Sequence, residues 1–124
     1  MRDTEGRDLE GSISSERVLA AHRLLIAQVP GLGLKLSHNS GHVKAVRLHD
    51  AKNRYLFSWI PAQQHLLFYV RRPALNSSPH VRESAFGALP RTDTNPRGEV
   101  TSKLEGAEDA KAVISWLSQL LPLP

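Results

Sequence analysis

The sequence predicts an α+β domain: an antiparallel meander sheet of four to five strands packed against two to three helices. Two apolar, aromatic runs, 55–60 and 66–72, are joined by the short segment PAQQ, which is typical of an antiparallel hairpin. Helical spacing of apolar residues occurs near each end of the chain. Short polar turns separate the remaining strands, so neighbours in sequence are expected to pair. The expected order is α-β-β-β-β-α-β-α.

The first helix is expected from Ser14 to Val29. Ser14 or Ser15 can cap it, and Glu16 lies near the positive end of the helix dipole. Four apolar residues share one face: Val18, Ala21, Leu25 and Val29. The segment PGLG (30–33) then ends the helix. Residues 1–12 hold few apolar side chains and are expected to form a mobile N-terminal tail, with one domain over 13–124.

Strands are expected at 34–37, 43–49, 55–60, 66–72 and 99–104. Polar turns, HNSGH (38–42) and DAKN (50–53), separate the first three. Pro61 has no backbone N–H to donate within a central ladder, so it places the hairpin turn.

The C-terminal half is expected to hold two helices. Ser78 and Pro79 fit the start of a helix over 76–89, and a polar loop follows over 90–98. The last helix has the clearest apolar stripe, with Glu108 and Asp109 in its first turn. Its stripe consists of Ala110, Val113, Ile114, Leu117, Leu120 and Leu121.

Composition indicates a soluble globular chain, since 40% of its 124 residues are hydrophobic and 23% are charged. No apolar run approaches the roughly 18 residues that a membrane-spanning helix needs, and the first residues lack the apolar core of a secretory signal. The chain has no cysteine, which excludes disulfides, thiolate metal sites and a cysteine nucleophile. A cytoplasmic location is therefore expected.

Positive charge is concentrated in the middle of the chain. The net charge is +4, but residues 18–97 hold eleven basic and three acidic side chains, a balance of +8. Such a distribution favours a polyanionic partner. A basic, solvated surface without a specific partner is the alternative.

The hairpin allows two interpretations. In regular strands, Tyr55, Phe57 and Trp59 lie on one face and Leu56, Ser58 and Ile60 on the other, so both faces are largely apolar. Such a pair is typical of a central, covered position. Alternatively, Tyr55, Trp59 and Tyr69 lie on an open face beside arginines. Aromatic rings there stack on bases at roughly 1–3 kcal/mol each.

Basic residues flank the hairpin, and Arg97 lies with Asn95 and Gly98 in the polar loop. Because Arg71 and Arg72 are adjacent, they point to opposite faces within a strand, or both reach solvent where the strand ends before Pro73. The expected nucleic-acid-binding residues are Lys44, Arg47, Arg54, Tyr55, Trp59, Tyr69, Arg71, Arg72 and Arg97.

Catalytic and metal-binding patterns are missing from the sequence. His38 and His42 are four residues apart, but Asn-Ser-Gly between them favours a turn, and no acidic ligand is near. The Gly-x-Ser-x-Gly elbow, the phosphate-binding glycine loop and the carboxylate clusters of nucleases do not occur. We therefore expect no enzymatic activity, no catalytic residue, no metal and no cofactor.

Two segments carry a family resemblance: LLFYVRRP (66–73) and NPRGEVTSKLEGAEDAKAVISWL (95–117). Over roughly residues 34–121 the chain resembles small uncharacterised α+β domains laid out like the YjbR/MmcQ-like, double-wing proteins. Such domains are found beside predicted nucleases. The resemblance implies an α+β fold, favours nucleic acid as partner and assigns no catalytic residue.

The sequence thus predicts a non-catalytic nucleic-acid-binding domain that uses a basic, aromatic hairpin. The alternative is a protein-interaction or homodimerisation module, an accessory subunit without a role in nucleic-acid binding. It depends on a sheet edge strand, or on the apolar end LSQLLPLP (117–124) with Trp116.

Overall fold

The computed structural model describes residues 9–39 and 44–124. In chain order, the described elements are α2 (Glu16–Gln28), the 3-10 helix η1 (Val29–Leu32), β1 (Lys35–Asn39), β2 (Ala45–His49), β3 (Tyr55–Pro61), β4 (Leu66–Val70), α3 (Arg72–Ser77), α4 (His80–Ala88), β5 (Thr92–Thr94), β6 (Val100–Leu104) and α5 (Ala107–Leu120).

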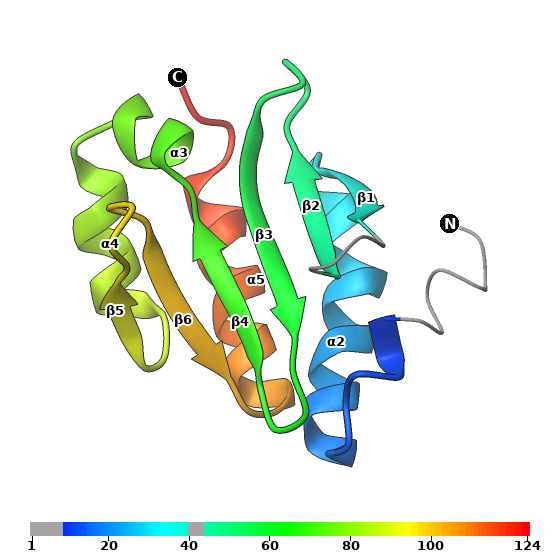
Figure 1. The fold of residues 1–124 in the computed structure, drawn as a ribbon. Coiled ribbons are helices and arrows are strands. Elements are labelled where there is room, and N and C mark those ends of the chain that lie inside the picture. Colours follow the sequence, from blue (N-terminus) through cyan, green and yellow to red (C-terminus); the bar gives the residue numbers. More distant parts are fainter. Residues whose placement is uncertain (1–8, 40–43) are drawn as a thin grey trace.

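Within this part of the chain, six strands form one antiparallel sheet in the order β1-β2-β3-β4-β6-β5 (Figure 1). The α+β class and the antiparallel sheet are confirmed. The sheet has more strands than expected, and the helix expected over 76–89 is replaced by two shorter ones, α3 and α4.

The helices cover one face of the sheet. In the view of Figure 1, α2 and α5 lie behind the strands, and α4 packs against α5. α2 begins where Ser15 caps it, its hydroxyl oxygen accepting a hydrogen bond from the Val18 N–H at 3.4 Å. No helix of the described residues has both the length and the apolar character that crossing a membrane requires.

Burial alternates along β4 and β6, which have one buried face and one more exposed face. In β4, Leu66, Phe68 and Val70 are buried beneath the helices, whereas Leu67 and Tyr69 are half-buried on the other side. Across the ladder, Trp59 pairs with Phe68 and is fully buried. The front of the sheet in Figure 1 therefore forms an open face, which no described helix covers.

A register shift redirects Tyr55. Between β2 and β3 the pairing shifts between Leu48 and His49, so that Phe57 pairs with Leu48 but Tyr55 pairs with His49. Leu56 of β3 therefore has no pairing partner in β2, as in a β-bulge. Tyr55 consequently lies on the open face, opposite to the buried Phe57, and the predicted assignment of both to one face is wrong.

A tight turn converts the expected 90–98 loop into a hairpin. The side-chain oxygen of Asn95 accepts hydrogen bonds from the N–H groups of Arg97 (3.1 Å) and Glu99 (2.9 Å). Gly98 adopts a φ of 81°, which glycine adopts without steric cost. The turn brings the polar residues of β5 back onto β6 as an edge strand.

The folded region starts before the predicted limit of the tail at residue 12. Leu9 is only 2% exposed and joins the core, and Glu10 accepts two hydrogen bonds from Arg23, both at 3.1 Å. Residues 1–8 of the predicted tail, and residues 40–43 of the predicted HNSGH turn, lie outside the described residues.

Candidate nucleic-acid interface

The open face is hollowed into a groove of about 550 Å³. Strands β2, β3 and β4 form its floor, and the β5–β6 turn forms one wall. Charged or aromatic side chains line much of it: Arg47, Tyr55, Tyr69, Arg71, Arg97 and Glu99. We refer to this hollow as the arginine groove.

Tyr55 organises the cations of this groove. The Arg71 guanidinium carbon lies 3.7 Å from the centroid of the Tyr55 ring, and Arg71 Nη1 donates to the Tyr55 carbonyl at 2.7 Å. Arg47 approaches the same ring at 5.6 Å, and His49 stacks on it with centroids 5.2 Å apart. A guanidinium over an aromatic face is attracted by the ring quadrupole. Tyr55 thus holds two arginines beside the groove.

One carboxylate accompanies the three arginines. Glu99 is 8% exposed; its oxygens accept a hydrogen bond from Asn95 Nδ2 at 3.0 Å and lie 3.7 Å from Arg71 Nε. In the described residues, Arg47 and Arg97 form no ion pair. The groove therefore keeps a positive excess, with two guanidinium groups available to an anion.

Two further hollows adjoin the arginine groove. One, of about 660 Å³, shares Tyr69, Asn95 and Pro96 with it and extends over β5 and β6. The other, of about 330 Å³, shares Arg71, Arg97 and Glu99 and is also lined by Arg72. We refer to them as the β5–β6 hollow and the α3 hollow. Because they share lining residues, the two hollows each border the arginine groove.

Tyr69 lies at the junction of the arginine groove and the β5–β6 hollow. It is half-buried, and both its burial and the nearby Glu99 carboxylate raise the pKa of its phenol. Its cross-strand neighbours are the short side chains Ser58 and Thr101. Ser58 is buried, whereas Thr101 is half-buried, so the ring borders more open surface on the β6 side.

The structure brings together five of the predicted binding residues: Arg47, Tyr55, Tyr69, Arg71 and Arg97. Arg72 begins α3 and lines the α3 hollow instead. Lys44 directly precedes β2 and is not among the residues that line the groove. Trp59 is buried on the helix-covered face, where its indole N–H donates to His22 Nδ1 at 3.0 Å. Trp59 is therefore not available for stacking on a base.

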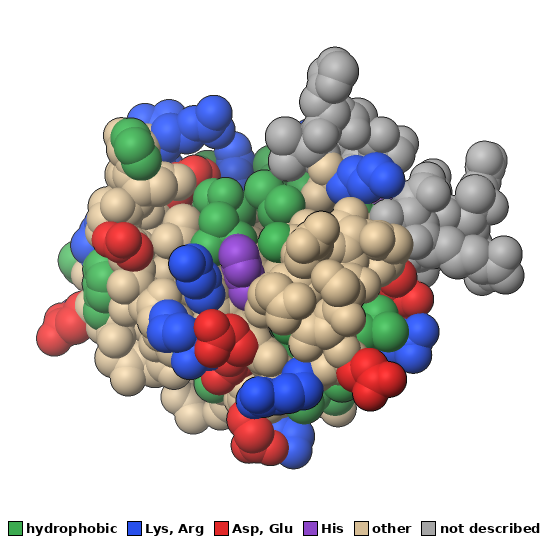
Figure 2. Space-filling model, turned by 60° about the horizontal axis from the view of Figure 1, so that its bottom comes forward, with side chains coloured by type: hydrophobic (Ala, Val, Ile, Leu, Met, Phe, Trp, Pro, Cys, Tyr) green, Lys and Arg blue, Asp and Glu red, His purple; other side chains and the backbone are tan. Residues whose placement is uncertain are grey.

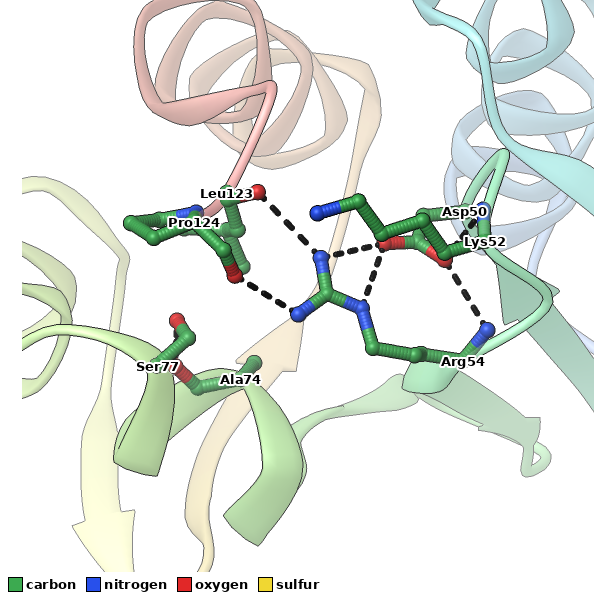
Figure 3. A network of polar contacts seen from close by, with 7 residues as sticks. All are labelled: Asp50, Lys52, Arg54, Ala74, Ser77, Leu123 and Pro124. Carbon is green, nitrogen blue, oxygen red and sulfur yellow. Dashed lines mark hydrogen bonds and ion pairs between the residues drawn. The ribbon is translucent and has the colours of Figure 1, made fainter.

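Arg54 is occupied by a structural network (Figure 3). Its Nη1 and Nη2 donate to the carbonyl oxygens of Pro124 (2.7 Å) and Leu123 (3.2 Å), and its Nε donates to Asp50 Oδ2 at 2.8 Å. Asp50 also accepts from the N–H groups of Lys52 and Arg54. Burial of the Asp50 carboxylate raises its pKa. The hydrogen bonds and the positive charge of Arg54 outweigh this effect, so the pKa of Asp50 is lowered.

Replacement of Arg54 by Ala is expected to lower the free energy of unfolding by about 1–3 kcal/mol, because the nearly buried Asp50 loses its charged partner. Nucleic-acid affinity of the folded variant is expected to stay unchanged. Urea denaturation and a binding titration measure the two effects. Lys52→Ala, at an exposed neighbouring position, is the control. An intact stability with a lost affinity contradicts the structural role.

Charges are mixed elsewhere. Figure 2 shows the end of the molecule that lies at the bottom of Figure 1, and there Lys and Arg side chains alternate with Asp and Glu. Among the described residues, Arg91 pairs with Glu105 at 3.5 Å and with Asp109. In the arginine groove, by contrast, Arg47 and Arg97 form no ion pair within the described residues.

Sequence reasoning missed Ser58 and Glu99 as groove residues. A serine inside an apolar strand was the signal for Ser58, because a small polar residue there leaves room at the sheet surface. Glu99 gave no comparable signal, since its position depends on the Asn95 turn.

In the described part of the chain, no group of three His, Cys, Asp or Glu side chains is placed to hold a metal ion. No protein-family model, curated protein or solved structure matches this chain. The resemblance to the YjbR/MmcQ-like layout therefore stays a prediction.

Proposed function

We propose that this protein binds nucleic acid without catalysis, through the open face of its sheet. The observation that carries the proposal is the arginine groove: three guanidinium groups and two tyrosines line one concave surface with a single carboxylate. Guanidinium groups bind phosphate oxygens with paired N–H donors. Aromatic rings beside them suit contact with bases.

Arg47 and Arg97 are the proposed phosphate-binding residues. Neither forms an ion pair within the described residues, so a phosphate does not have to displace a carboxylate from them. Arg71 is partly committed to Tyr55 and Glu99 and is proposed to orient the groove. Because contacts to phosphate carry no sequence information, binding is expected to depend on salt more than on sequence.

The double variant Arg47→Ala, Arg97→Ala is expected to bind roughly tenfold more weakly at low salt. The slope of log affinity against log salt is expected to fall by about 1 for each lost phosphate contact. Fluorescence anisotropy with labelled random-sequence DNA and RNA, single- and double-stranded, at two salt concentrations measures both quantities. Stability is expected to change little, since both side chains lie at the surface of the groove.

The matched control is Arg17→Ala, Lys111→Ala. It removes the same charge from exposed positions on α2 and α5, which cover the opposite side of the sheet. An equal loss in both double variants assigns binding to net charge alone and contradicts the groove. Wild-type protein that binds none of these probes at the lower salt contradicts the proposed function as a whole.

A protein-interaction module is the second candidate, and the position of β1 favours it. β1 lies at one edge of the sheet, with β2 as its partner in the described ladder, and an edge strand offers N–H and C=O groups to another chain. Trp116 no longer supports this function, because it is buried and donates to Ser84 Oγ at 2.9 Å. Sedimentation over a range of concentrations tests for a stable dimer.

A further inference from the structure

Tyr69 occupies a distinctive place on the open face. It lines both the arginine groove and the β5–β6 hollow, and each hollow is large enough for a nucleotide. The residues directly across the ladder are Ser58 on β3 and Thr101 on β6. Both side chains are shorter than the phenol ring; Ser58 is buried and Thr101 is half-buried.

The two groove tyrosines differ in what contacts their rings. The Tyr55 ring carries the guanidinium of Arg71 and is stacked on His49. Among the described residues, Tyr69 has no guanidinium over its ring and no aromatic stacking partner. Tyr55 therefore supports the cations, whereas Tyr69 is the ring that a ligand can stack on.

The two hollows also differ in charge. The arginine groove holds a positive excess, as described above. In the β5–β6 hollow, the basic residues Arg91 and Lys103 are balanced by Asp93 and Glu105. The other residues that line it are uncharged. An anionic phosphate is favoured in the first hollow, and a neutral base or sugar is accommodated in the second.

We infer, on the basis of the function proposed above, that the open face takes nucleic acid as a single strand, with Tyr69 stacking between two nucleotide subsites. The phosphates of the strand lie toward Arg47 and Arg97 in the arginine groove. Bases within a duplex are already stacked and expose only their edges, so a half-buried ring on the floor of a hollow cannot reach their faces. Unpaired bases present a π-face to such a ring.

The inferred path is short. It leads from the β5–β6 hollow through the arginine groove to the α3 hollow, where Arg72 joins Arg47 and Arg97 as a third arginine for phosphate contact. With about three phosphate contacts, the slope of log affinity against log salt is expected near −2 for a single strand.

Tyr69→Leu is expected to lower affinity for a labelled single strand of about 12 nucleotides roughly tenfold, within the range of alanine replacements at stacking positions. Tyr69→Phe keeps the ring and is expected to bind within about twofold of wild type. A duplex of the same sequence is expected to bind more weakly and to be insensitive to both variants. Anisotropy titrations measure affinity, and circular dichroism checks folding; Tyr69→Met replaces Tyr69→Leu if the latter unfolds.

Four results overturn the inference. A duplex that binds as tightly as the single strand shows that unpaired bases are not required. An unchanged affinity of Tyr69→Leu shows that the Tyr69 ring does not stack on a base. An oligoglutamate of similar length that competes as well as the strand shows recognition of charge alone. If binding still depends on Arg47 and Arg97 with a duplex, the proposed function survives without this inference. If neither nucleic acid binds at low salt, both fail.

Discussion

Replacement of Trp59 by Ala is expected to lower the free energy of unfolding by about 3–5 kcal/mol. Trp59 is fully buried in the centre of the sheet, with its ring edge-on to His22 at a centroid distance of 5.9 Å. Truncation leaves a cavity beneath the helices and removes the only described hydrogen-bond donor to His22 Nδ1. Because small domains are stable by about 5–15 kcal/mol in total, this single change removes a large share.

Trp59→Phe separates packing from hydrogen bonding. It keeps an aromatic ring but leaves His22 Nδ1 buried without its donor, for an expected loss of about 1–3 kcal/mol. Trp116→Phe is the matched control, because its partner Ser84 also donates to the Val81 carbonyl at 3.0 Å and keeps that bond. Urea denaturation of the variants gives the free energies. A Trp59→Ala variant within about 1 kcal/mol of wild type contradicts a tightly packed centre.

The periodicity of apolar residues in the sequence predicted the fold class, because buried positions in a helix or strand repeat with the period of its backbone. The stripe of α5, with Ala110, Val113 and Leu117 buried, follows the 3.6-residue period. Leu66, Phe68 and Val70 follow the two-residue period of a strand. The alternating burial of β4 also shows that this strand of the hairpin is fully buried on one face only, which its apolar composition left open.

The candidate site was predicted less completely, because it depends on departures from these periods. The register shift at Leu48 and His49 moves Tyr55 to the open face, and strict alternation places it in the core. Arg71 lines both the arginine groove and the α3 hollow, whereas Arg72 starts α3 and lines the α3 hollow alone. Spacing alone does not reveal where a strand ends or a bulge occurs.

Long-range contacts were beyond prediction for a related reason. Arg54 reaches carbonyl oxygens some seventy positions away in sequence, and no local pattern distinguishes it from a solvated arginine. Similarly, the position of Arg97 over the sheet follows from the Asn95 turn and from Arg82, which donates to the Gly98 carbonyl at 2.9 Å. The basic character of the open face was predictable from composition, but which arginines lie on it was not.

The stability of the protein is expected to fall as the pH decreases from about 6.5 to about 4. His22 is 1% exposed, and burial lowers its pKa from 6.5 to about 4; the nearby Glu10 opposes this shift, while His38 and Arg23 add to it. In the unfolded chain His22 takes up a proton near pH 6.5, whereas in the folded protein it stays neutral until about pH 4. Acidification across this window therefore favours the unfolded state.

The effect at about pH 5 is expected to be a loss of about 2 kcal/mol relative to about pH 7.5. Glu10 and Asp50 have lowered pKa values, so their contributions are lost as the pH falls through values below 4.5 and 3.8. The window above about pH 5 consequently reports mainly on His22. Urea denaturation at several pH values measures the free energy of unfolding, and the midpoint and slope are fitted together.

His22→Gln tests the assignment because a glutamine side chain does not titrate, and its amide oxygen is able to accept the Trp59 N–H. The variant is expected to lose most of the pH dependence between about pH 7.5 and 5 while remaining folded at neutral pH. His80→Gln, at an exposed position on α4, is the control and is expected to keep the wild-type profile. If wild type and His22→Gln lose stability in parallel, another group titrates in this window. The Trp59–His22 hydrogen bond is then not the acid-sensitive element of the core.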